Sequence, residues 1–127
     1  MTPKKILIVD DDASIREVLA TQLTRLNYTA FTAADGQEGV AAFKKIQPDL
    51  VLMDVMMPKL DGLAACQQMR ASEKKGSRTP ILFLTARDSR HDKLTSAISG
   101  GDDFVSKPVS LQELRERVEK ALNKRKP

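Results

Sequence analysis

Short runs of apolar residues alternate along the chain with stretches in which apolar residues have helical spacing. Three continuous runs, within residues 5–9, 50–53 and 80–85, are typical of strands buried on both faces of a sheet. Two weaker runs, residues 28–33 and 103–107, complete a set of five predicted strands. Threonines alternate with apolar residues in the run at 28–33, which predicts an edge strand.

Five helices are predicted between and after these strands. They cover residues 13–26, 36–47, 62–71, 89–99 and 111–122. Asp12 and Ser110 stand where an N-cap would satisfy the first free N–H groups of the first and the last helix. On the first helix the apolar side chains expected to share one buried face are Ile15, Val18, Leu19, Leu23 and Leu26.

Alternation of strand and helix predicts βαβ units, right-handed crossovers and a parallel sheet covered by helices on both faces. The most apolar strands belong in the middle of such a sheet, and the predicted strand order is 2-1-3-4-5. We therefore expect an α/β, doubly wound, flavodoxin-like (βα)5 fold. Residues 1–127 are expected to form a single domain with a core over about 4–122 and a short basic tail.

Composition limits the classes of function. The 21 basic and 17 acidic residues give a net charge of +4, and they are spread along the chain. One Tyr, four Phe and no Trp offer little material for stacking nucleic-acid bases, so no direct nucleic-acid partner is expected. Cys66 has no partner for an internal disulfide. No apolar run is long enough for a membrane span or signal peptide, so the cytoplasm is the expected compartment.

Polar and charged side chains stand at the carboxyl ends of four predicted strands. Strand one delivers Asp10 and Asp11, strand three Asp54, strand four Thr85 and strand five Lys107. In a parallel sheet these ends lie along one rim, next to the switch point where ligands bind. The sequence therefore predicts a single site built from residues far apart in the chain.

The charges at this rim indicate the chemistry. Three clustered carboxylates repel one another and need a compensating cation. A set of oxygen ligands open to solvent suits Mg²⁺, and a lysine beside it can help to stabilise a transferring phosphoryl group. An aspartate in that setting can itself be the nucleophile and form an acyl phosphate.

Each of these residues also has a purely structural interpretation. Asp54 could end its strand or cap a neighbouring segment, Thr85 could be an ordinary strand residue, and Lys107 could lay its stem on the surface. Their occurrence together at four strand ends favours the functional interpretation.

The chain resembles the receiver domain of bacterial two-component response regulators from Ile6 to about Leu122. The matching motifs are ILIVDDD at residues 6–12, LVLMDVMMPKLDG at 50–62, LTA at 84–86 and DDFVSKP at 102–108. The resemblance implies a signalling domain rather than an enzyme, whose own chemistry is limited to self-phosphorylation and self-dephosphorylation.

For the rim, the resemblance implies that Asp54 accepts a phosphoryl group from a sensor histidine kinase or phosphotransfer protein. It implies that Asp10, Asp11, Asp54 and the backbone carbonyl of Met56 hold Mg²⁺ or Mn²⁺, and that Thr85 and Lys107 contact the phosphate.

For the output, the resemblance implies that Thr85 and the aromatic Phe104 switch together and remodel the face formed by helix four, strand five and helix five. The residues expected on this partner face are Lys93, Ile98, Asp103, Glu113 and Arg117. The contact made there would be with a downstream protein, with an output domain, or with a second copy in a phosphorylation-dependent homodimer.

Two other function classes fit the sequence less well. A Mg²⁺-dependent phosphohydrolase with an aspartyl nucleophile would need an acid two residues after it, where this chain has Met56. A flavin carrier of the same fold would need a phosphate-binding loop after strand one. There the chain has three aspartates, which would repel phosphate.

Overall fold

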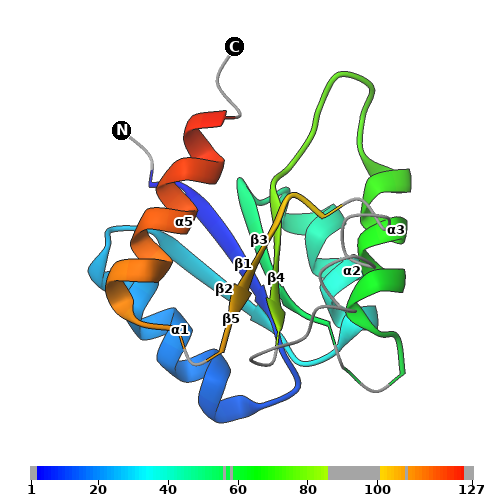
Figure 1. Ribbon diagram of the computed structural model, residues 1–127. Helices are drawn as coiled ribbons and strands as arrows, with labels where there is room; N and C mark the ends of the chain where they lie inside the picture. The colour runs from blue at the N-terminus through cyan, green and yellow to red at the C-terminus, as the bar shows by residue number, and fades with distance from the viewer. Residues whose placement is uncertain (1–2, 56, 58, 86–100, 108, 125–127) are drawn as a thin grey trace.

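The computed structural model describes residues 3–55, 57, 59–85, 101–107 and 109–124 of the 127-residue chain (Figure 1). The strands are β1 (Lys5–Val9), β2 (Thr29–Ala33), β3 (Leu50–Asp54), β4 (Ile81–Thr85) and β5 (Asp103–Ser106). The helices are α1 (Ala13–Arg25), α2 (Gly36–Ile46), α3 (Gly62–Ser72) and α5 (Leu111–Lys124). Among these helices none has the length and apolar content that crossing a membrane requires. The helix predicted over 89–99 lies outside the described residues.

All five strands are parallel and form one sheet in the order β2-β1-β3-β4-β5. The prediction of a doubly wound, flavodoxin-like α/β fold is confirmed. The three apolar strands β1, β3 and β4 occupy the centre, and the alternating strand β2 lies at an edge, because only a central strand must bury both of its faces.

Helices α1 and α5 cover one face of the sheet, and α2 and α3 cover the other (Figure 1). Successive residues of β1 point to opposite faces, as in any strand. Ile6 and Ile8 accordingly belong to the core cluster under α1 and α5, whereas Leu7 and Val9 belong to the one under α2 and α3. All four side chains are fully buried, and each contributes about 1.5–3 kcal/mol through removal of apolar surface from water.

The start of each described helix is capped by a side chain. Asp12, Asp35, Asp61 and Ser110 accept hydrogen bonds from backbone N–H groups two or three residues further along, over 2.8 to 3.3 Å. Such a cap stabilises a helix by about 0.5–2 kcal/mol. The two caps predicted from the sequence, Asp12 and Ser110, are confirmed.

The prediction that Val18 lies on the buried face of α1 was wrong. Val18 is 54% exposed, whereas Leu19 and Leu23 are buried. Each residue turns a helix by about 100°, so Ile15, Leu19 and Leu23 lie within an arc of about 80° and Val18 falls about 100° from its centre. Leu111, at the first position of α5, is also partly exposed, at 37%.

Candidate metal centre

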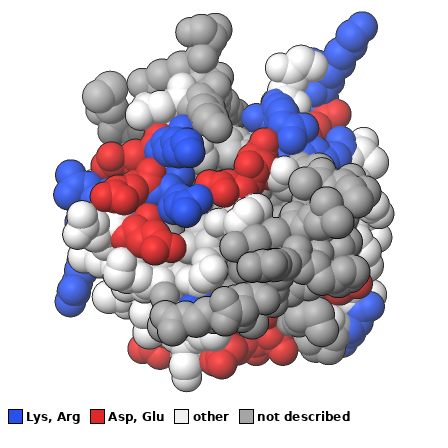
Figure 2. Space-filling model, viewed as in Figure 1, with Lys and Arg blue, Asp and Glu red and all other residues white. Residues whose placement is uncertain are grey.

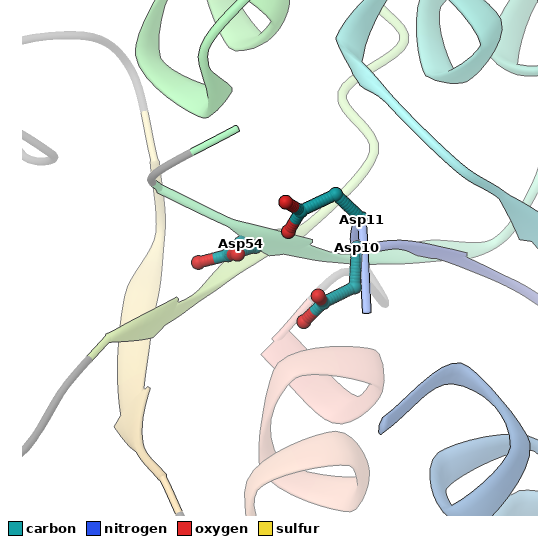
Figure 3. A group of neighbouring side chains, drawn as sticks. All are labelled: Asp10, Asp11 and Asp54. Carbon is teal, nitrogen blue, oxygen red and sulfur yellow. The ribbon is translucent and has the colours of Figure 1, made fainter. Parts of the chain in front are cut away.

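The ends of β1 and β3 bring three carboxylates together. Val9 pairs with Met53 in the register of the two strands, so the residues that follow them come out side by side at the carboxyl rim. Asp10, Asp11 and Asp54 each offer an oxygen within 4.8 Å of the other two. Figure 3 shows the three side chains projecting from these neighbouring strand ends. The predicted convergence of strands one and three is thus present.

Asp10 is held rigidly. Its side chain is fully buried, and its Oδ1 accepts a hydrogen bond of 2.9 Å from the backbone N–H of Asp12. Arg16 donates from Nη1 to the backbone carbonyl of Asp10 at 2.6 Å. Sequence reasoning missed Arg16, because a side chain that contacts main chain leaves no motif; its only signal was a basic residue in the first turns of the helix that follows the aspartates.

The backbone of Asp54 packs directly against the start of α3. A Cβ added at Gly62 would overlap the carbonyl oxygen of Asp54. The N–H of Gly62 also donates to the carbonyl of Val55 at 2.9 Å. Glycine is therefore required at this position, because its lack of a side chain lets the helix approach the end of β3.

Lys107 follows β5 and links the two buried carboxylates. Its Nζ lies 3.0 Å from Oδ2 of Asp10 and 3.4 Å from Oδ1 of Asp54. Burial by itself lowers the pKa of this ammonium group. The close contact with Asp10 and the negative charges of Asp54 and Asp10 outweigh that effect and hold the pKa above its ordinary value. The lysine is therefore a fixed cation at neutral pH.

The donor set fits a hard divalent cation. All three candidate ligands are carboxylates, which is the ligand type that Mg²⁺ prefers. Oδ2 of Asp10 is buried and receives no hydrogen bond from the described residues, although it meets Lys107. Asp11 is exposed, so the cluster is open to solvent, as a metal that keeps several waters needs. Met56, the fourth ligand suggested by the resemblance, lies outside the described residues.

The two residues expected to act as a switch lie on the neighbouring strands. Thr85 is the last residue of β4 and pairs in register with Ser106. Its backbone thus reaches the same rim as the carboxylates. Phe104 pairs with Phe83 and packs, half-buried, against the core cluster under α2 and α3.

Part of the expected partner face is described. Asp103 and Arg117 form an ion pair of 2.9 Å between β5 and α5. Glu113, half-buried in the first turn of α5, donates its backbone N–H to Ser110. Lys93 and Ile98, the other two residues expected on this face, lie outside the described residues.

Comparison with known families decides what kind of site this is. The family model of the response regulator receiver domain matches residues 6–119. The chain belongs to this family. Receiver domains are parts of two-component signalling proteins, so the flavin carrier and the phosphohydrolase are excluded as its class. As a receiver domain, it is a signalling unit rather than a conventional enzyme.

Individual relatives agree with the family. The receiver domain is 44% identical over 124 residues to probable transcriptional regulator ycf27 of Porphyridium aerugineum, which covers 98% of this chain and 50% of that protein. The chain thus spans about half the length of the curated relatives it matches. Its fold superposes on the chemotaxis protein CheY4 of Vibrio cholerae with a TM-score of 0.86 and 32% identity, over 94% of this chain and 98% of that chain.

A second solved structure bears on the metal. The receiver domain of sensor histidine kinase PA1611 from Pseudomonas aeruginosa has a magnesium ion coordinated in its active-site cleft. It superposes with a TM-score of 0.87 and 30% identity, covering 95% of this chain and 98% of that chain. Receiver domains thus bind Mg²⁺ at an acidic site, and the present chain carries an acidic cluster of the required composition.

Proposed function

We propose that Asp54 accepts a phosphoryl group from the phosphohistidine of a sensor histidine kinase or phosphotransfer protein. In this step a carboxylate oxygen of Asp54 forms a bond to phosphorus. The bond from phosphorus to the imidazole nitrogen of the donor breaks, and that nitrogen keeps the electron pair. The product is an acyl phosphate on the receiver domain, which water later hydrolyses back to the free carboxylate.

One observation carries this proposal: Lys107, at the carboxyl rim of the sheet, contacts both Asp10 and Asp54. The Nζ of Lys107 lies 3.4 Å from Oδ1 of Asp54, within reach of any group attached to that oxygen. A fixed cation at this distance stabilises the negative charge that spreads over phosphoryl oxygens during transfer. Burial of Asp54 to 8% exposure keeps bulk water from screening that interaction.

Asp10, Asp11 and Asp54 would hold Mg²⁺ or Mn²⁺, together with the backbone carbonyl of Met56. When bound, the metal would offset the charge of the carboxylates and of the phosphoryl oxygens. Thr85 would donate its hydroxyl to a phosphoryl oxygen. The chain itself supplies the nucleophile, the positioning of Asp10 by its hydrogen bonds with Asp12 and Arg16, and the lysine.

Phosphorylation would be passed on by Thr85 and Phe104. The two residues lie on the adjacent strands β4 and β5, and Phe104 is only half-buried, so its ring has room to change position. Contacts of Thr85 with the phosphate would favour one of two arrangements of these strands, which is a shift of population between pre-existing states.

The output would be a contact made by the face of α5 and β5 in the cytoplasm, without direct binding of nucleic acid by this domain. The residues proposed for it are Lys93, Ile98, Asp103, Glu113 and Arg117. The partner would be a downstream protein, an output domain of the same polypeptide, or a second copy of the chain. A relative is named as a transcriptional regulator and is about twice as long, which favours an output domain.

Intact-protein mass spectrometry tests the proposal. The protein is incubated with acetyl phosphate or beryllofluoride, with and without Mg²⁺. We expect one phosphoryl or BeF₃⁻ adduct that needs Mg²⁺ and that disappears in Asp54→Ala. Glu116→Ala, which removes an exposed carboxylate from α5, should label like the wild type. An adduct that survives in a folded Asp54→Ala protein, or its absence from the wild type, would reject the role of Asp54.

A further inference from the structure

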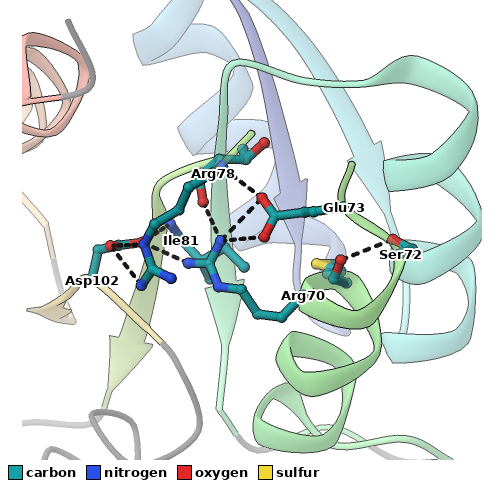
Figure 4. A network of polar contacts seen from close by, with 8 residues as sticks. Arg70, Ser72, Glu73, Arg78, Ile81 and Asp102 are labelled. Carbon is teal, nitrogen blue, oxygen red and sulfur yellow. Dashed lines mark hydrogen bonds and ion pairs between the residues drawn. The ribbon is translucent and has the colours of Figure 1, made fainter. Parts of the chain in front are cut away.

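At the end of the sheet opposite Asp54, an arginine ties together α3, β4 and the start of β5. The guanidinium of Arg70 donates to the carbonyl of Thr79 at 2.7 Å and pairs with Glu73 at 3.1 Å and with Asp102 at 2.7 Å. Figure 4 shows this network, in which Arg78 also meets Asp102. The Arg70 side chain is only 14% exposed, so the network is a fixed part of the fold.

This network leaves the acidic groups of the region already paired. Asp102 contacts Arg70 and, at 3.1 Å, Arg78. Its Oδ2 also accepts the backbone N–H of Ile81 at 2.8 Å. Asp103 pairs with Arg117 at 2.9 Å. Both aspartates are thus neutralised by arginines and do not offset the charge of the nearby lysines.

Three exposed lysines lie near the network of Arg70. Lys74 and Lys75 belong to the loop after α3, and Lys120 stands on α5. None of the three forms an ion pair with another residue in the described part of the chain. In Figure 2, basic side chains lie over the loop and over α5, with acidic side chains between them. The local charge that remains after internal pairing is therefore positive.

The lysines border a groove of about 640 Å³ between this loop and α5. Its lining includes three buried apolar residues, Pro80, Leu82 and Ala121, in addition to the charged side chains. The volume is in the range of sites that bind small molecules or peptide side chains. Apolar residues with lysines at the border suit a ligand that carries both an apolar group and negative charge.

We propose that this groove binds a short acidic segment of a partner protein through one apolar anchor residue. Acidic side chains of the segment pair with Lys74, Lys75 and Lys120. The anchor enters the groove beside the exposed edge of Ala121 and between the apolar stems of these lysines. A peptide fits better than nucleic acid, because the described residues of the lining include no aromatic side chain on which a base could stack. Charge complementarity of this kind sets specificity and association rate.

The groove is connected to the proposed signalling site through β5. Asp103 lines the groove and begins this strand, and Lys107 lies just beyond its other end. Binding at the groove can nevertheless be measured without any phosphodonor. Failure of one proposal therefore leaves the other standing.

Fluorescence anisotropy provides the test. The probe is a fluorescein-labelled peptide in which glutamates flank a central Leu-Phe pair, titrated with the full chain at low salt. A double charge reversal, Lys75→Glu with Lys120→Glu, should weaken binding by at least about tenfold, since two attractions become repulsions. The matched control, Lys44→Glu with Lys45→Glu on the exposed surface of α2, changes the net charge equally and should stay within about twofold.

Two further measurements make the test decisive. Amide chemical shifts of the ¹⁵N-labelled protein should move around Lys75, Leu82 and Lys120 on addition of the peptide. A peptide with serines in place of the Leu-Phe pair should bind more weakly. No binding at millimolar peptide, equal losses in both double variants, or shift changes centred elsewhere would overturn the proposal. Tighter binding of an oligothymidine probe at the same residues would replace the acidic peptide by nucleic acid as the partner.

Discussion

Lys107 places its ammonium group 3.0 Å from the buried Oδ2 of Asp10. This oxygen receives no hydrogen bond from the described residues, so the lysine is its main compensating group in the metal-free protein. The same oxygen belongs to the carboxylate cluster that fits Mg²⁺. Lysine and metal therefore act on the same negative charge.

Replacing Lys107 by methionine should destabilise the metal-free protein and increase its response to Mg²⁺. Loss of the lysine leaves buried negative charge unpaired, and we expect the free energy of unfolding to fall by about 2 kcal/mol. Mg²⁺ then meets no competing cation, so it should restore much of that loss. Urea unfolding with EDTA or with Mg²⁺ measures both effects, with Lys45→Met as the control for an exposed lysine. An equal gain from Mg²⁺ in Lys107→Met and wild type would contradict this expectation.

The contribution of Lys107 to stability should disappear at high pH. Its pKa in the folded protein lies above the ordinary value of 10.5. The stabilisation is therefore fully present below that value and is lost as the pH rises through the higher pKa of the folded state. We expect the difference in unfolding free energy between wild type and Lys107→Met to shrink between neutral pH and about pH 12. Tyr28, whose pKa is also raised mainly by burial, is present in both proteins and cancels. A difference that stays constant across this range would show that the charge of Lys107 is not what stabilises the fold.

Gly62→Ala should disturb the proposed phosphoacceptor. The new Cβ would overlap the carbonyl oxygen of Asp54, and we expect a loss of about 1–3 kcal/mol in stability together with slower formation of the BeF₃⁻ adduct. Gly76→Ala is the matched control. Gly76 has a φ of +84° but no atom within 4 Å of an added Cβ, so alanine there should cost about 1 kcal/mol and leave adduct formation unchanged. Equal adduct rates in both variants would argue against tight coupling of Gly62 to the site.

The thiol of Cys66 should react only when the protein opens. Burial raises its pKa to about 11, and its side chain is fully buried in the core under α2 and α3. Since the thiolate is the reactive form, modification by Ellman's reagent at pH 8 should be at least about a thousandfold slower in the native protein than in denaturing urea. Rapid labelling under native conditions would mean that this part of the core opens far more easily than the packing indicates.

The order of the sheet was predictable because burial on one or two faces leaves a direct trace in the sequence. The continuous apolar run at 50–53 can only be satisfied in the centre, whereas the threonines of residues 28–33 tolerate an edge. The position of Val18 was not predictable in the same way. Its apolar side chain fits the helical spacing approximately, but it lies outside the arc that touches the sheet.

The carboxylates and Lys107 could be brought together from the sequence because strand ends in a parallel sheet share one rim. The network around Arg70 could not be predicted in this way. Arg70 and Asp102 are 32 positions apart. Asp102 belongs to the motif at residues 102–108, but that motif gives no indication of Arg70 as a partner. Their pairing follows only from how the end of α3 lies against the start of β5, which is a property of the assembled fold.

Among the described strands, β5 is the outermost on its side of the sheet and pairs only with β4. It is stiff along its length, and at about 3.3 Å per residue it sets Asp103 and Lys107 some 13 Å apart. A slide of this strand has to break one ladder of hydrogen bonds instead of two. The strand thus carries Lys107 at one end and Asp103, which lines the groove, at the other, and within the described part of the chain it is hydrogen-bonded along one edge alone. A displacement of the strand at either end therefore reaches the other end directly.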